Sequence, residues 1–325
     1  MKYITQSFNK VKKIEIVNGI LCVLSDKKII INEKNKYFVN FNSETIYTYK
    51  NNIFSDENFY YNLLVKELIT ISELENYFYS NIFFKDKMLF TNNDCKIYSF
   101  EKETIIKQFP FFLEGSVCLL FEKNMLIRYS NNISNYEIDT LEKKWEQTFS
   151  SLMKEEKVTI SNEILEISGT IYFILFGEEK KACFGLDANT GKVLKTIPNV
   201  VGELIAENEF IYFLHSEKIT IFNTTNDQIT TWKIENIMIQ NGIDRLWFPR
   251  WAVNNGLIYF SQSKNSDIHS GNNGSKFGIL DPLKKELIWQ HQLSSENGTI
   301  GEIKVYNDNI YLHTQDKTLF VFEKE

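Results

Sequence analysis

The stretch of residues 183–197, CFGLDANTGKVLKTI, decides the fold of this chain. A strand-like run of large apolar residues leads into the polar turn DANTGK, and a second short strand follows. Gly191 can take the positive φ that a hairpin loop needs, and Asp187 can accept hydrogen bonds from amides of the turn. The stretch therefore predicts a β-hairpin whose turn is fixed by an aspartate side chain.

The same hairpin pattern recurs along the chain. Residues 277–293, FGILDPLKKELIWQHQL, again place an Asp at the end of one strand. Eight residues after that Asp stands Trp289, where the first copy has Lys195. Weaker copies lie at residues 136–149 and 221–234. Repetition of one supersecondary unit indicates a repeat architecture.

Eight such hairpins can be counted, each introduced by a polar residue pair typical of a turn. These pairs begin at Asn18, Asn51, Asp86, Lys123, Ser168, Asn208, Asn255 and Asp308. Most of the spacings are close to the ~40–45 residues of a four-stranded propeller blade, the architecture of WD40-like proteins. No stretch has sustained helical apolar periodicity, so we expect almost no helix beyond one short turn at Ser72. We predict an all-β, closed β-propeller of four-stranded blades, with eight blades and seven as the alternative.

The two ends of the chain are complementary in this scheme. Residues 2–8, KYITQSF, read as a strand without a hairpin, and the last hairpin lacks a fourth strand. Pairing the N-terminal strand with residues 318–322 would remove two free sheet edges. We therefore predict a single domain over residues 1–325 that is closed by its termini.

Composition and charge exclude several classes of protein. The net charge of -6 argues against a general nucleic-acid binder, because neutralising phosphates requires a basic surface. The first residues lack the apolar core of a signal peptide, and the longest apolar runs are too short for a membrane span. Cys22, Cys95, Cys118 and Cys183 are widely separated and suit reduced core residues. We expect a cytoplasmic protein without nucleic-acid or membrane partners.

The segment LDANTGKVL at residues 186–194 resembles the blade motif of the quinoprotein-like (PQQ-like) β-propeller superfamily. In that motif an Asp, a Thr-Gly-Lys turn and a later Trp recur from blade to blade. The residues that match in this sequence are Asp187, Thr190, Gly191, Lys192 and, in the second copy, Trp289. The turn after Asp281, PLKKE, departs from the pattern. The resemblance implies the fold, and propellers of one fold have many unrelated functions.

Quinone chemistry and metal binding are not expected. The resemblance would require an adjacent cysteine pair and a secretory signal in a quinoprotein dehydrogenase, and the sequence has neither. The alternating oxygens of Asp187 and Asn189 suit calcium, but no acid follows to complete the cage. We therefore predict no cofactor and no metal site.

No catalytic signature is recognisable either. His215 and His313 occupy equivalent places in two repeats, which favours an architectural role. The sequence contains no nucleophile elbow, P-loop, zinc spacing or dinucleotide fingerprint. A glycosidase that takes two acids from different blades stays open, because such a pair needs no proximity in sequence.

Two irregular stretches interrupt the repeats and carry the predicted binding site. Residues 244–251, DRLWFPRW, are rich in Trp and Arg, the types enriched at binding hot spots. Residues 262–276 form a long polar insertion, and both stretches should lie on one face of one blade. The alternative is that Trp247, Phe248 and Trp251 enter the blade core and that the insertion is only a loop. The predicted binding residues are Arg245, Trp247, Arg250, Trp251 and His269.

These observations favour a non-enzymatic scaffold that binds another protein. A narrower form is a neutralising, immunity-type protein that blocks its partner, and we expect a monomer. The alternative is a carbohydrate or small-ligand binding protein, or a hydrolase, that uses the mouth of the central channel.

Overall fold

The computed structural model describes residues 3–26, 28–32, 36–41, 43–55, 59–75, 78–84, 87–92, 94–110, 116–243, 246, 249–262 and 274–324. The chain divides into two compact units, which are described separately below. Unit 1 comprises Met1–Ile53 and Ile205–Glu325, and unit 2 comprises Phe54–Leu204. The single domain over residues 1–325 stays a prediction.

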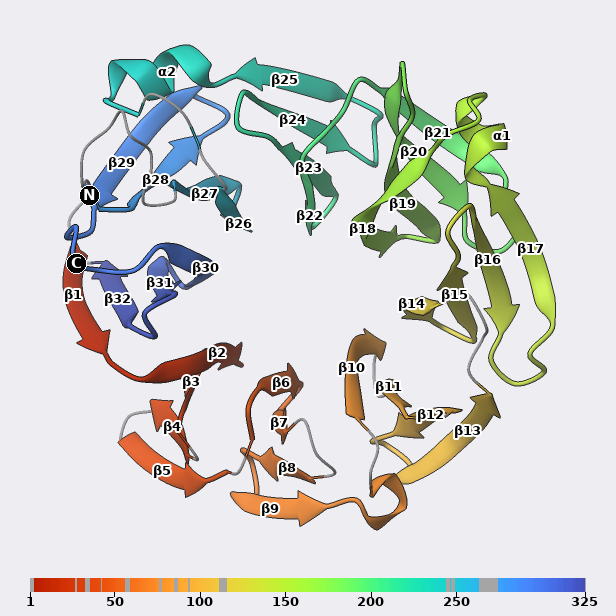
Figure 1. Ribbon diagram of the computed structural model, residues 1–325, viewed down its shortest axis with the longest axis horizontal. Coiled ribbons are helices and arrows are strands. Elements are labelled where there is room, and N and C mark those ends of the chain that lie inside the picture. The colour runs from red at the N-terminus through yellow and green to blue at the C-terminus, as the bar shows by residue number, and fades with distance from the viewer. Residues whose placement is uncertain are drawn as a thin grey trace. The chain divides into compact units, whose positions relative to one another are not determined.

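The strands of the described residues form eight four-stranded sheets, so the fold is an all-β propeller of eight blades (Figure 1). The prediction of eight blades is confirmed, and the alternative of seven is wrong. Three blades of unit 1 are β2 (Val11–Val17), β3 (Ile20–Ser25), β4 (Lys28–Asn32), β5 (Lys36–Asn40); β26 (Arg250–Asn254), β27 (Leu257–Gln262), β28 (Lys276–Asp281), β29 (Glu286–Gln292); and β30 (Ile300–Tyr306), β31 (Asn309–Thr314), β32 (Leu319–Lys324), β1 (Tyr3–Phe8).

The remaining blades are formed in the same way. Three belong to unit 2: β10 (Phe78–Phe84), β11 (Lys87–Thr91), β12 (Asp94–Ser99), β13 (Thr104–Pro110); β14 (Ser116–Phe121), β15 (Asn124–Arg128), β16 (Asn132–Glu137), β17 (Lys143–Thr148); and β18 (Thr159–Ile167), β19 (Thr170–Phe176), β20 (Lys181–Asp187), β21 (Val193–Pro198). Two blades include a unit boundary: β6 (Ile46–Tyr49), β7 (Asn52–Ser55), β8 (Phe59–Asn62), β9 (Glu67–Thr70); and β22 (Glu203–Glu207), β23 (Phe210–Leu214), β24 (Lys218–Asn223), β25 (Ile229–Lys233).

Helix is confined to three short segments of the described chain. The 3-10 turn η1 (Ser72–Leu74) lies where a short turn was expected. The helices α1 (Phe149–Met153) and α2 (Glu235–Gln240) each follow the fourth strand of a blade and precede the next blade. Within the described part of the chain, no helix has the length and apolar character needed to cross a membrane.

The hydrophobic core lies between neighbouring blades. In unit 2, one cluster joins Trp145 and Phe149 to Phe173 and Phe184 of the following blade, all of them buried. In unit 1, Phe277 of β28 meets Phe322 of β32, with ring centroids 4.8 Å apart. These sheets bury side chains on their faces against the next blade. A blade is therefore stabilised by neighbouring sheets rather than by itself.

The aspartate-capped turn predicted from residues 183–197 is present between β20 and β21. Asp187 Oδ1 accepts hydrogen bonds from the amides of Asn189 and Thr190, at 3.0 and 2.7 Å, and from the Thr190 hydroxyl at 2.9 Å. Side-chain oxygens at the equivalent strand ends accept amides two and three residues further on. These residues are Asn62, Asn223 and Asp281.

The same turn is locked to the preceding blade. The carbonyl of Ala188 accepts hydrogen bonds from Trp145 Nε1 at 3.0 Å and from Asn135 Nδ2 at 2.9 Å. The indole of Trp145 lies so close to Gly191 that a Cβ there would be 2.6 Å from the ring. Gly191 also has a φ of 69°, so both its backbone conformation and its surroundings require glycine.

The predicted pairing of the N-terminal strand with the C-terminal strand is present within unit 1, while closure of one ring over residues 1–325 stays a prediction. Strand β1 pairs antiparallel with β32, in a register that runs from Tyr3 opposite Lys324 to Phe8 opposite Leu319. The N and C labels of Figure 1 lie side by side at this blade. His313 Nε2 also donates to the Val11 carbonyl at 2.9 Å, which ties this blade to β2.

Deletion of residues 1–8 should lower stability and cause self-association. It removes six cross-strand pairs, each worth roughly 0.2–1 kcal/mol, and exposes an unpaired edge on β32. Thermal unfolding and light scattering measure the two effects, with Ser7→Ala as the control. An unchanged melting temperature in the truncated protein would argue against a stabilising role for β1.

Asp187→Asn should keep the turn but remove its dependence on pH. Hydrogen bonds from the Thr190 hydroxyl and amide lower the pKa of Asp187 below its ordinary value. The ionised Asp187 carboxylate therefore stabilises the fold at any pH above the ordinary carboxyl pKa. This contribution is lost as the pH falls through the lowered pKa of the folded state. An amide side chain supports the equivalent turns at Asn62 and Asn223 without titrating.

Unfolding by denaturant at neutral pH and at about pH 3 tests this comparison. The wild type should lose more stability on acidification than the variant does, and Asn223→Asp should introduce the same loss at another turn. Equal acid sensitivity of Asp187→Asn and the wild type would contradict the assignment.

Candidate functional site

The predicted binding residues fall into two groups. Arg245, Trp247 and His269 lie outside the described residues, as do Phe248 and most of the polar insertion. Arg250 and Trp251 are the first two residues of β26, the first strand of its blade. The insertion joins β27 to β28, so both irregular stretches belong to the blade that was predicted.

Trp251 points into the protein. Its side chain is 7% exposed and packs with Phe260, their ring centroids 6.4 Å apart. Adjacent residues of a strand face opposite sides, so a buried Trp251 leaves Arg250 on the surface. The alternative proposed for this residue, a place in the blade core, is the one observed.

Arg250 is exposed, and the neighbouring blade holds it in place. Its Nε donates to the Gly301 carbonyl of β30 at 2.9 Å, and its backbone amide donates to Ser261 Oγ at 3.2 Å. Among the residues that the structure describes, neither Nη group has a hydrogen-bond or ion-pair partner. The guanidinium is therefore fixed at one edge and open to a ligand at the other.

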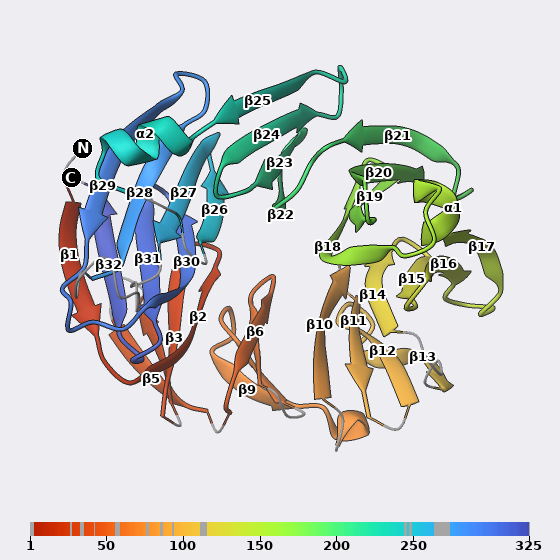
Figure 2. The same cartoon turned by 45° about the horizontal axis from the view of Figure 1, so that its top comes forward.

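The connector that leads to Arg250 is pinned to its own blade. Helix α2 lies beside β29 in both orientations of the ribbon (Figures 1 and 2). Lys276 at the start of β28 donates to the Gly242 carbonyl, and Gln290 of β29 donates to the Asn241 carbonyl at 3.3 Å. Met238 and Ile243 of this connector are buried in the core between the blades.

The first strands β2 and β30 carry a cluster of four alternating charges. Lys13 lies 3.1 Å from Glu302 and 3.9 Å from Glu15, while Lys304 lies 2.5 Å from Glu15 and 3.5 Å from Glu302. Each carboxylate thus meets two ammonium groups. This arrangement provides no uncompensated pair of acids of the kind that a glycosidase uses.

Three of the four cysteines, Cys22, Cys95 and Cys183, are buried. Burial raises the pKa of Cys95 to about 11 and that of Cys118 to about 12, so both remain protonated at neutral pH. Burial also lowers the pKa of His291, which stacks on Trp289 with an interplanar angle of 9°. Among the described residues no group of three or more His, Cys, Asp or Glu could hold a metal ion.

Comparison with known proteins identifies the architecture. No protein-family model matches the sequence, and no curated protein matches it. The structure is similar to Sqt1 of Saccharomyces cerevisiae, at 10% identity and a TM-score of 0.60, covering 100% of this chain and 98% of that one.

Two further solved structures are similar over nearly their whole length. BamB from Moraxella catarrhalis is 11% identical with a TM-score of 0.58, covering 99% of this chain and 100% of that one. The computationally designed protein Ika8 is 8% identical with a TM-score of 0.64, covering 97% and 96%. At this identity the likeness concerns the fold alone. The resemblance to quinoprotein-like propellers is therefore confirmed at the level of fold.

Proposed function

We propose that this propeller is a non-enzymatic scaffold that binds another protein through the surface around Arg250. The observation that carries the proposal is the guanidinium of Arg250, exposed but held by its Nε bond to Gly301. An arginine fixed in this way loses little side-chain freedom when it binds, and its two Nη groups suit bidentate contact with a carboxylate. We propose an acidic segment of a partner as the ligand of this surface.

The distribution of arginine supports this choice of surface. The chain contains three arginines, and two of them, Arg245 and Arg250, belong to the single segment DRLWFPRW. The third, Arg128, has a partner within its own unit, since Nη1 donates to the Ser161 carbonyl at 3.4 Å. Arginine is enriched at protein interfaces, whereas lysine, the common cation of this chain, is depleted there.

Arg250→Ala should weaken partner binding without unfolding the protein. Truncation of a hot-spot arginine typically costs ~2 kcal/mol or more, about thirtyfold in affinity. Capture from the native cell, identification by mass spectrometry and titration of the purified partner would measure this. Arg250→Lys keeps the charge but not the bidentate fork, so it should restore only part of the affinity.

Trp251→Ala is the matched comparison, because the adjacent residue is buried in the core. It should lower the free energy of unfolding by roughly 3–5 kcal/mol. Arg250→Ala should change stability little, because its side chain is exposed. Full partner binding by a folded Arg250→Ala variant would move the binding surface elsewhere.

The identity of the captured protein also tests the narrower, neutralising form of the proposal. If the partner is an enzyme whose activity the chain blocks, the neutralising role is supported. If the partner keeps its activity in the complex, the general scaffold role is supported instead.

A further inference from the structure

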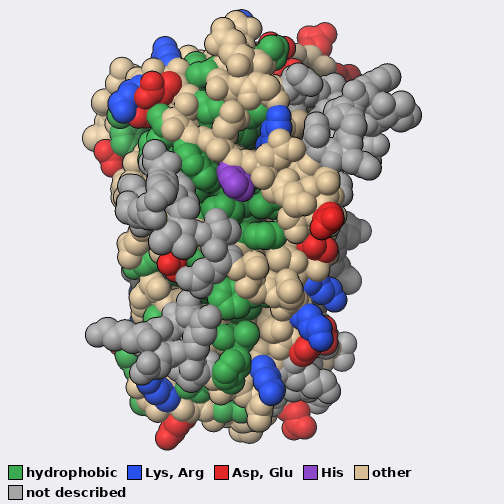
Figure 3. Space-filling view, turned by 90° about the vertical axis from the view of Figure 1, so that its left-hand side faces the viewer, with side chains coloured by type: hydrophobic (Ala, Val, Ile, Leu, Met, Phe, Trp, Pro, Cys, Tyr) green, Lys and Arg blue, Asp and Glu red, His purple; other side chains and the backbone are tan. Residues whose placement is uncertain are grey.

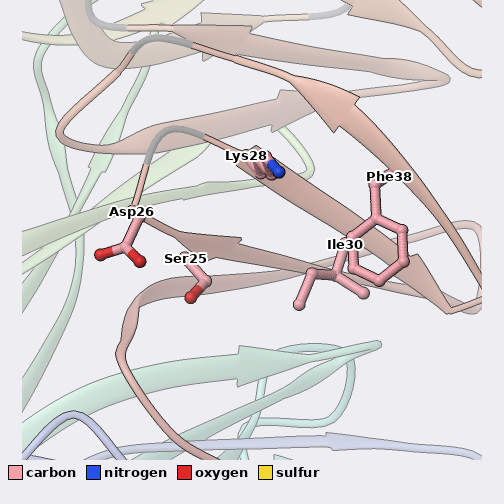
Figure 4. A pocket seen from close by; sticks show the side chains of 5 residues that line it. All are labelled: Ser25, Asp26, Lys28, Ile30 and Phe38. Carbon is pink, nitrogen blue, oxygen red and sulfur yellow. The ribbon is translucent and has the colours of Figure 1, made fainter.

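A hollow of about 410 Å³ opens on blade β2–β5 of unit 1. Its lining residues are Ser25, Asp26, Lys28, Ile30 and Phe38. Figure 4 shows Ile30 and Phe38 side by side at one end, Asp26 and Ser25 at the other, and Lys28 between them. Phe38 is 65% exposed, which is unusual for a phenylalanine that has an apolar neighbour.

The hollow lies at the junction with the blade that the termini close. Ile30 packs against a cluster that combines Leu21 and Val23 of its own blade with Leu319 and Val321 of β32. The connector at this junction, between β1 and β2, consists of Asn9 and Lys10 only. A connector of two residues leaves little side-chain volume to fill the outer part of the junction.

At two other junctions, a short helix lies between the fourth strand of one blade and the first strand of the next. Between β17 and β18, helix α1 buries Phe149 and Met153 against the following blade. Between β25 and β26, helix α2 buries Met238 in the same manner. The hollow therefore occupies the place that a short amphipathic helix takes elsewhere in this chain.

The residues that line the hollow are equivalent to those that hold α2. Lys28 is the first residue of the third strand β4, as Lys276 is of the third strand β28. Phe38 pairs with the third residue of β4, Ile30, just as Gln290 pairs with the third residue of β28, Gly278. Lys276 and Gln290 donate to the carbonyls of Gly242 and Asn241 at the C-terminal end of α2.

The charges of the hollow are available for a ligand. Within the described chain, Asp26 and Lys28 form no ion pair with each other or with any other residue, and both are exposed. An ammonium group is favoured beside the last carbonyls of a helix, which carry the negative end of the helix dipole. Lys28 is therefore suited to the role that Lys276 has at α2.

We propose that this hollow binds the C-terminal turn of an amphipathic helix of a partner protein. An apolar side chain of that helix packs on Ile30 and Phe38, its last carbonyls accept from Lys28, and a basic side chain pairs with Asp26. Figure 3 shows hydrophobic side chains exposed in several patches on the face that lies at the left of Figure 1, among backbone and polar atoms. The inference rests on the proposed protein-binding function, but not on Arg250.

A peptide of the chain's own α2 segment, residues 233–243 (KIENIMIQNGI), is the probe. A lactam between Glu235 and a lysine introduced by Ile239→Lys would hold it helical, because i,i+4 residues are neighbours on a helix. Both positions are exposed in α2, so the bridge lies away from the packed face. The fluorescent peptide is titrated with the full chain, and anisotropy reports binding.

We expect saturable binding that Phe38→Asp and Lys28→Glu each weaken at least about fivefold, the effect of losing one energetic interface contact. Met238→Ser in the peptide should weaken binding to a similar extent, because it removes the buried apolar side chain. The control Leu68→Asp changes an exposed apolar residue on another fourth strand, and Lys102→Glu changes an exposed lysine on the turn between β12 and β13. Both controls should bind as the wild type does.

Absence of binding, or binding that neither hollow variant weakens, overturns the proposal. A concentration-dependent increase in mass by light scattering that Phe38→Asp abolishes would assign the hollow to a second copy of the chain instead. Arg250→Ala should leave peptide binding unchanged. The peptide assay can therefore fail while partner capture succeeds, and partner capture can fail while the peptide binds. The two results thus distinguish failure of this inference from failure of the proposed function.

Discussion

The junction between neighbouring blades is the constraint on which the rest of the structure depends. A four-stranded sheet is too small to bury both of its faces, so its stability comes from the sheets beside it. At the best defined junction, in unit 2, the carbonyl of Ala188 accepts hydrogen bonds from Trp145 and Asn135 of the preceding blade. The bonds of Asp187 inside its own turn hold that carbonyl in position. A local turn and a long-range contact thus depend on one another.

The same junction can be made by different side chains. Lys107 of β13 pairs with Ile97 at the ladder irregularity of its blade, as Trp145 pairs with Asn135 in the next blade. The Lys107 ammonium donates to the Asp139 carbonyl in the turn of the following blade. At these two junctions the same strand position holds a donor to the next blade, an indole in one case and an ammonium group in the other. Different residue types can therefore make the same contact, which weakens the sequence similarity between these two blades.

Features that arise from short-range patterns could be predicted from the sequence. The turn at Asp187, the eight blades and the pairing of β1 with β32 follow from alternation, turn residues and spacing. The binding segment was harder, because residue types alone do not say which side of a strand is buried. Alternation along a strand places the side chains of Arg250 and Trp251 on opposite sides. Only the position of β26 between two blades determines which of the two faces the core.

The hollow beside Phe38 had no signal in the sequence. It depends on a short connector, on a phenylalanine in a fourth strand and on a junction between the two ends of the chain. The connector and the lining residues lie within residues 9–38, whereas Leu319 and Val321 of the same junction come from the other end of the chain, and each residue is unremarkable by itself. Only the comparison of equivalent positions, Lys28 with Lys276 and Phe38 with Gln290, relates the hollow to a helix-filled junction.

The pairing of β1 with β32 also determines when the blade that contains them can finish folding during synthesis. Strand β1 is synthesised before its partner β32, and the strands of all the other blades are made in between. At about 5–20 residues per second, the interval between them is on the order of tens of seconds. Throughout that time β1 has no sheet to join, and long-range pairings of this kind form slowly. Each new molecule therefore carries β1 unpaired for that whole interval, a period in which a chaperone has reason to bind this strand.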